Sequence, residues 1–213
     1  MYSSGYNQGS YIGRRYDSIT GVWTPSVYPD ETRITAQATD LPITLAMMKT
    51  VLPVYESADD NYISLLIDAV TEQISRYIGQ DVAQVTRQSI WYRPYKINYL
   101  PFGIHGNITS VVSRTEDGTD TALVEGTDYY IQGLDFKRIK LDDLALNGAF
   151  LVTTYQSGYT AGNIPAAMKA AIFQEVALQY KNRQDANLPA RVSMGGLSIE
   201  ARHLLMPFVR HVV

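Results

Sequence analysis

Few residues in this sequence stand in a pattern that supports covalent chemistry. The segment GYTAG at residues 158–162 has the glycine spacing of a nucleophile elbow, with Thr160 in the position of the serine nucleophile. It lies between a predicted strand and a predicted helix, as an elbow does. No histidine has an evident role beside it, however, and a secondary alcohol is a poor substitute for serine. We therefore interpret the segment as a turn into a helix, and a hydrolase built around Thr160 is a remote alternative.

Metal and cofactor sites have equally little support. The histidine and paired-acid candidates are His105, His203, His211, Asp59-Asp60 and Asp142-Asp143. The histidines show no HExxH or i,i+4 pairing, and the acidic pairs lack further ligands at a recognisable spacing. The chain has no cysteine, which excludes thiol catalysis and zinc–thiolate sites, and it contains no Walker A or GxGxxG motif. We expect no catalytic residue, no metal, no cofactor and no enzymatic activity.

The charge and hydropathy of the chain bear on whether nucleic acid or a membrane is its partner. The formal net charge of −3 gives no electrostatic reason to wrap nucleic acid, although DNA could still slide past the protein. Six basic residues of the sheet region form either a phosphate-facing patch or, as we favour, solvated strand faces: Arg87, Arg93, Lys96, Lys137, Arg138 and Lys140. No apolar run approaches membrane-spanning length, and the N-terminus does not resemble a signal peptide. We expect a protein made inside the cell, without a membrane partner.

The element that organises the chain is an amphipathic helix predicted over residues 57–79. Ser57 is expected to cap its first turn together with Asp60, and Gly79 to end it in a left-handed cap. Its apolar stripe recurs at three- and four-residue steps: Ile63, Leu66, Ile67, Val70, Ile74, Tyr77 and Ile78. A short helix capped at Thr44 precedes it, and a second long helix begins near Pro165.

Strand signals fill the region between the two long helices. They occur at residues 85–92, 108–114, 121–124, 128–131, 138–141 and 149–155. We expect these to form a small antiparallel sheet in a meander. The predicted fold is therefore α+β, with a core of two long helices plus short helices, the sheet, and extended terminal arms. Its divisions are a Tyr/Gly-rich arm at 1–40, a core domain at 41–185 and a C-terminal docking segment at 186–213.

Both termini carry features beyond the core. The N-terminal arm spaces aromatic residues regularly and is either a disordered tail or an arm that orders on a neighbouring subunit. Its candidate anchors are Tyr2, Tyr6, Tyr11, Tyr16 and Trp23. A last helix capped by Ser198 leads to an apolar C-terminus that is either tucked into the core or docked on a partner. We favour docking, because residues up to 185 already account for a fold.

The ordered set of segments resembles a family. The segments are ITL at 43–45, RYIG at 76–79, TEDGT at 115–119, DYYI at 128–131, YTAG at 159–162 before IP at 164–165, and QYKNR at 179–183. The chain resembles the head–tail connector (adaptor) proteins of long-tailed bacteriophages over roughly residues 41–185. It departs from the compact family pattern in its N-terminal arm and in the sheet region at 90–148.

The resemblance implies a non-enzymatic virion protein located at the neck, the head–tail junction, and made in the host cytoplasm. Such adaptors form a homo-oligomeric ring, usually dodecameric, beneath the portal protein. The ring extends the channel through which genomic DNA passes without sequence-specific binding, and the tail or a stopper protein attaches to it. The alternative within the same setting is a stopper or tail terminator, which is usually dominated by β-structure.

The resemblance also gives the two termini candidate roles. The candidate portal-docking residues are Leu204, Leu205, Met206, Phe208 and Arg210. Truncation after Gly196 is then expected to leave a folded protein that no longer binds portal. The aromatic residues of the N-terminal arm are expected to clasp a neighbouring subunit or the capsid.

Overall fold

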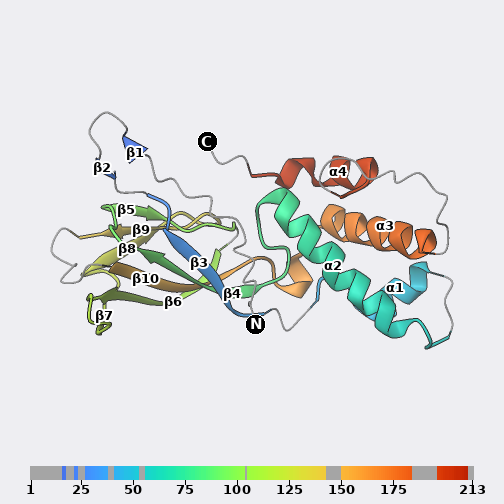
Figure 1. The fold of residues 1–213 in the computed structure, drawn as a ribbon, viewed down its shortest axis with the longest axis horizontal. Helices are drawn as coiled ribbons and strands as arrows, with labels where there is room; N and C mark the ends of the chain where they lie inside the picture. Colours follow the sequence, from blue (N-terminus) through green and yellow to red (C-terminus); the bar gives the residue numbers. More distant parts are fainter. Residues whose placement is uncertain are drawn as a thin grey trace, which may run out of the picture. The chain divides into compact units, whose positions relative to one another are not determined.

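The fold is α+β and divides into two compact units. The computed structural model describes residues 16–17, 22–23, 27–37, 41–52, 56–103, 105–142, 150–183 and 196–210. The sheet unit comprises Met1–Ala36, Thr86–Pro101 and His105–Gln156. The helical unit comprises Gln37–Val85, Phe102–Ile104 and Ser157–Val213. In the described part of the chain all four α-helices belong to the helical unit, and the strands form antiparallel sheets (Figure 1).

The helical unit is built around α2 (Asp60–Ile78), as the apolar stripe predicts. Six of the seven predicted stripe residues are buried, and Tyr77 packs half-buried against the same core. Gly79 ends the helix at a φ of 68°, and its N–H donates to the carbonyl of Ser75. A left-handed φ costs glycine little, which is why the helix stops where the sequence places a glycine.

The predicted start of this helix is wrong by two residues. The N-cap is Asp59, not Ser57, and its side chain makes no capping hydrogen bond. The Asp59 carboxylate instead accepts hydrogen bonds from the Tyr180 hydroxyl (2.5 Å) and from the Arg183 guanidinium (2.8 Å). A contact between two helices has therefore replaced the local capping box that the sequence favours.

Three further helices complete the unit. They are α1 (Leu45–Val51), α3 (Ala166–Asn182) and α4 (Ile199–Leu205), with 3₁₀ turns η1 (Ala161–Asn163) and η2 (Met206–Phe208). α1 and α3 contact α2, and α4 contacts α3. Thr44 accepts from the N–H of Met47 and Ser198 from that of Ala201, so both predicted caps are confirmed. Pro165 was expected at the first helical position of α3. It is instead the N-cap, one residue before Ala166, where the helix begins. α3 contacts α1, α2 and α4, which encloses the shared core.

Among the described residues, ten short strands belong to the sheet unit, except for Val85 and Ser157 at the ends of two of them. They are β1 (Tyr16–Asp17), β2 (Val22–Trp23), β3 (Glu31–Ala36), β4 (Val85–Trp91), β5 (Ile97–Tyr99), β6 (His105–Arg114), β7 (Asp120–Ala122), β8 (Tyr129–Gln132), β9 (Arg138–Leu141) and β10 (Phe150–Ser157). The sheets have the orders β1-β2, β3-β4-β10-β6-β7 and β5-β9-β8. All six predicted strands are present, but they do not form a meander.

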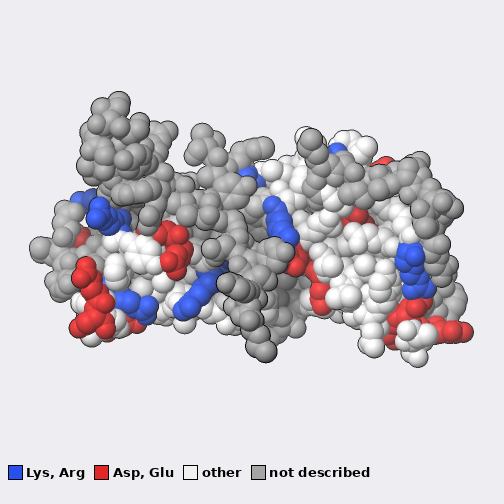
Figure 2. Space-filling view, in the orientation of Figure 1, with Lys and Arg blue, Asp and Glu red and all other residues white. Residues whose placement is uncertain are grey.

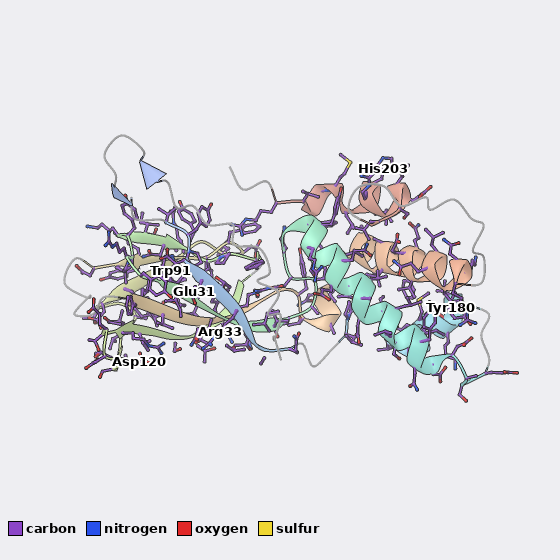
Figure 3. The ribbon with its side chains drawn as sticks, viewed as in Figure 1. Glu31, Arg33, Trp91, Asp120, Tyr180 and His203 are labelled. Carbon is purple, nitrogen blue, oxygen red and sulfur yellow. The ribbon has the colours of Figure 1, made fainter. Side chains whose placement is uncertain are left out.

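The strand order explains why the meander was wrong. β10 is the last strand in the sequence, yet it lies between β4 and β6. Five of its eight residues are buried, including Ser157 at its end, as is typical of a strand with neighbours on both sides. β3, which the sequence analysis grouped with the N-terminal arm, pairs with β4 from Glu31 opposite Ile90 onward. Figure 3 shows Glu31 and Arg33 along this strand and Trp91 within the unit.

The sheet unit has a core of its own. Trp91 and Tyr155 are its largest fully buried side chains, and the core also includes Leu100, Val111, Tyr129, Ile139, Leu141 and Leu151. The Tyr155 hydroxyl lies 3.1 Å from that of Ser89 and also donates to the carbonyl of Pro101. A buried phenol therefore has polar partners, as its burial requires.

We predict that the contact at Asp59 makes stability depend on acid pH. Hydrogen bonds from Arg183 and then Tyr180 lower the pKa of Asp59 from 3.8 to about 2. Because the folded-state pKa lies below the unfolded one, this contribution is complete above 3.8 and is lost as the pH falls toward 2. In urea unfolding at stepped pH, the deficit of Asp59→Asn relative to the unmodified protein should shrink over that interval. Asp68→Asn, on the exposed face of the same helix, is the control; a deficit of Asp59→Asn that does not change with pH would contradict the prediction.

Candidate functional site

The GYTAG segment is a structural turn. Gly158 has a φ of 91°, and a Cβ there would lie 2.3 Å from the carbonyl oxygen of Ala83. Only glycine fits such a close approach of two backbones. Thr160 is exposed at the start of η1, and its hydroxyl accepts from the Asn163 amide at 3.0 Å. This arrangement positions a chain reversal, and it gives Thr160 no base.

The described residues contain no candidate for metal chemistry. Within those ranges, no three His, Asp or Glu side chains gather closely enough to hold an ion. A search of the helices in the same residues finds none that is both long and apolar enough to cross a membrane. The candidate site of this protein therefore has to be sought among its surfaces.

The six basic residues do not form one patch. Arg87 is buried in β4 of the five-stranded sheet, whereas Arg138 and Lys140 belong to β9 of the three-stranded sheet. Lys137 donates to the carbonyl of Gly106, and Arg138 approaches the hydroxyl and ring of Tyr99. Figure 2 shows Lys and Arg in separate places with Asp and Glu between them. A phosphate-binding stripe needs clustered cations, so the visible face lacks that electrostatic footprint.

Most of the C-terminal segment, our candidate docking region, packs into the helical core. Leu205 is 0% exposed, so its role as a docking residue is wrong. Leu197 and Ala201 of the same segment are also fully buried, while Leu204 and Phe208 pack half-buried against that core. Because α4 covers α3, the fold is not complete at residue 185. Truncation after Gly196 would therefore open the core instead of leaving a folded protein.

The chain beyond α4 also binds back onto α2. The N–H of Arg210 donates to the carbonyl of Ile78 at 2.9 Å. The Gln80 amide donates to the carbonyl of Phe208 at 2.7 Å. The first of these bonds satisfies a carbonyl at the C-terminal end of α2, where helices leave acceptors unpaired. The backbone of residues 208–210 is thus part of the helical unit.

What remains available on this segment is the outer side of α4. Ile199 is 53% exposed and Met206 is 63% exposed, and His203 between them is exposed as well. Their spacing of four and three residues places them on one side of a helix, and Figure 3 shows His203 on the outward side of α4. We call these three residues the α4 face. Of the five predicted docking residues only Met206 belongs to it; the i, i+4, i+7 spacing is the signal that would have found the other two.

The N-terminal candidates lie mostly outside the described residues, as Tyr2, Tyr6 and Tyr11 do. Tyr16 and Trp23 lie in the described strands β1 and β2, where they are direct antiparallel partners. The role of this arm in clasping a neighbour stays a prediction.

The core and surface roles of the C-terminal segment are separable by mutation. Leu205→Ala should lower the free energy of unfolding by about 2–5 kcal/mol, because it opens a cavity at a fully buried site. Met206→Ala, its exposed neighbour, should change it by less than about 0.5 kcal/mol. Urea unfolding followed by circular dichroism measures both. Equal, small effects would contradict the placement of Leu205 in the core.

Comparisons with known proteins agree with this geometry. Residues 42–118 match the family model described as phage gp6-like head–tail connector protein. A comparison with curated proteins gives no match. Two solved structures with a similar fold come from necks of gene transfer agent (GTA) particles. The chain in the neck of an empty particle, computed with C6 symmetry, is 14% identical with a TM-score of 0.69, covering 86% of this chain and 97% of that one. The chain in the neck of a native particle, computed with C12 symmetry, is 15% identical with a TM-score of 0.61, at the same coverage.

A third match, to a chain in the virion of a native GTA particle, has a TM-score of 0.68 at 14% identity, covering 85% of this chain and 96% of that one. At such identities the structures establish a shared fold, while the family model supplies the sequence relationship. The predicted resemblance is confirmed over residues 42–118, which match the model of the phage gp6-like head–tail connector family.

Proposed function

We propose that this protein is a structural connector at the neck of a phage or phage-like particle. The observation that carries the proposal is the agreement of two independent comparisons. A head–tail connector family model matches α1, α2 and the strands β4 to β6. Nearly the whole length of a neck protein, 97%, shares the fold. The absence of a metal cluster among the described residues and the structural role of the GYTAG turn are consistent with a role in assembly.

The connector would act as a ring of identical subunits, and we propose a dodecamer. One neck structure with this fold was computed with C12 symmetry. In a ring each subunit uses two different surfaces, one for each neighbour. Genomic DNA would pass through the centre, and the net charge of −3 favours passage over retention, because every cation–phosphate contact adds affinity.

The α4 face is our candidate for portal docking. Its two apolar side chains are exposed on a helix whose opposite side is locked into the core, so a partner would meet a rigid surface. Of the five predicted docking residues the candidate set keeps Met206 alone, and Ile199 and His203 are added to it. The tail or a stopper protein would attach to another surface of the ring.

The decisive test is negative-stain microscopy of this protein mixed with the portal protein encoded near it. We expect a new ring layer stacked on the narrow end of the portal, because a connector docks there before it receives the tail. Portal alone is the control. If both proteins are folded and no layer appears, the docking function is refuted, and a stopper or tail-terminator role becomes the better account.

The docking face has its own test. The double variant Ile199→Glu, Met206→Glu should remain folded, since both side chains are largely exposed, yet weaken portal binding at least about tenfold, because a carboxylate would be desolvated against an apolar partner. Val124→Glu, also exposed but in the sheet unit, is the matched control. Surface plasmon resonance on immobilised portal measures both affinities. Equal binding by the two variants would move the portal contact elsewhere on the protein.

A further inference from the structure

A buried carboxylate joins α3 to the start of α4. Glu175 of α3 is only 2% exposed and lies among the buried residues of the helical unit. Burial removes the water that solvates a carboxylate, which costs free energy unless hydrogen bonds within the protein replace that water. The partners of Glu175 therefore show why an acid stands at this position of the core.

Both carboxylate oxygens of Glu175 accept hydrogen bonds. Oε2 accepts from the backbone N–H of Ser198 at 3.0 Å, and Oε1 accepts from the side-chain amide of Gln179 at 3.2 Å. Gln179 is a neighbour on α3 itself, whereas Ser198 is 23 residues further along the chain and is the N-cap of α4. The bond to Ser198 is thus a direct polar link between the two helices.

This link completes a capping box whose parts come from two helices. In a capping box, the N-cap serine accepts from the N–H of the third helical residue, and a Glu or Gln at that third position accepts from the N–H of the N-cap. Ser198 makes the first bond, to the N–H of Ala201 at 3.2 Å. Ala201 is the third residue and has no side chain for the second bond. Glu175 of α3 makes it instead.

A helix as short as α4 depends on such external contacts. It has seven residues, too few to be stable by itself. Burial of Ala201 and Leu205 attaches it to the core, but apolar attraction is non-directional, whereas a hydrogen bond requires a particular distance and angle. The bond from Glu175 therefore defines where the helix begins. If α4 slid by one residue, its side chains would turn by about 100° around the helix axis.

We propose that Glu175 is the positioning residue of the α4 face; its effect on portal binding rests on the proposed connector function. The carboxylate holds Ser198, and Ile199, which follows directly, and Met206 are thereby presented in the orientation that the partner binds. Glu175 is buried and acts through α4 alone. Loss of the bond leaves the composition of the α4 face unchanged but distributes α4 over several orientations, of which one is competent to bind.

Replacement of Glu175 by an apolar residue of similar size tests the proposal by its direction. If Glu175 only fills space in the core, Glu175→Met should leave α4 equally or better protected, since it removes a buried charge. If Glu175 positions α4, backbone hydrogen exchange in α4 should accelerate at least about tenfold, and by more than any change in α2. Mass spectrometry of peptides from the two helices measures both. Gln174→Met, at the exposed neighbouring position of α3, is the matched control and should change neither.

The conservative variant Glu175→Gln adds a graded test. It retains one side-chain oxygen that can accept from Ser198, but its NH₂ group then faces the amide of Gln179, which is also a donor. We expect exchange in α4 to be intermediate between that of the unmodified protein and that of Glu175→Met. This variant also serves if Glu175→Met does not fold. Exchange in α4 that is as slow in both variants as in the unmodified protein would overturn the proposal.

Portal binding distinguishes this inference from the connector function. In surface plasmon resonance on immobilised portal, the affinity of Glu175→Met should fall at least about threefold, which corresponds to at most a third of the molecules in the competent orientation. Gln174→Met should bind like the unmodified protein. Faster exchange in α4 with unchanged portal affinity would overturn the positioning role. If the unmodified protein itself fails to bind portal, the docking function is refuted, while the exchange experiment still decides whether Glu175 sets the start of α4.

Discussion

The burial of one apolar stripe, that of α2, is the constraint on which the rest of the helical unit depends. A 19-residue helix with Ile63, Ile67 and Ile74 wholly inaccessible to solvent must be covered along its whole length. α1 and α3 contact α2, and buried residues of α4 extend the same core on α3. Because a cavity at such a site costs several kcal/mol, none of these helices is dispensable. The short C-terminal helix is therefore required by the core, although it lies far from α2 in the sequence.

This requirement determines which surfaces are left for partners. A helix that covers a core buries one side and leaves the other exposed. In this segment Leu205 of α4 is buried, and Met206, which follows it, is exposed. The backbone hydrogen bonds of residues 208 and 210 to Gln80 and Ile78 then fix the chain after α4. Consecutive residues in one short segment thus have opposite environments. A docking site on this protein has to be described by helix face, because sequence position alone mixes core and surface.

The sequence was informative where a local pattern has a single structural outcome. The stripe of α2, its glycine C-cap and the caps at Thr44 and Ser198 were all predicted, because periodicity and capping act within a few residues. The start of α2 was not predicted correctly. The Asp59 carboxylate accepts hydrogen bonds from Tyr180 and Arg183, which lie 121 and 124 residues away in the sequence. No local sequence pattern predicts that contact.

The sequence also did not predict which distant strands pair, or which apolar residues are buried and which are exposed. The six strands were recognisable, but nothing local places β10 between β4 and β6 or attaches β3 to β4. The apolar residues at the C-terminus follow the same logic. Leu205 in a core and Met206 on a surface are both hydrophobic, and hydrophobicity alone does not say whether the partner is the same chain or another one. Even so, the helical spacing of Ile199, His203 and Met206 was present in the sequence and distinguishes the two sides.

The family model matches a shorter part of the chain than the comparison of structures does, and this difference has a physical cause. The family model matches only residues 42–118, whereas the fold is shared over 86% of the chain at 14% identity. A core accepts many combinations of apolar side chains, provided that volume and pattern are kept. The backbone arrangement can therefore persist after the sequence has diverged. What must be retained are steric requirements that no side chain can replace, such as Gly158, which lies against the carbonyl of Ala83 where the chain turns toward α3. Surfaces carry no such requirement, so a contact surface has to be established for this chain from its own residues.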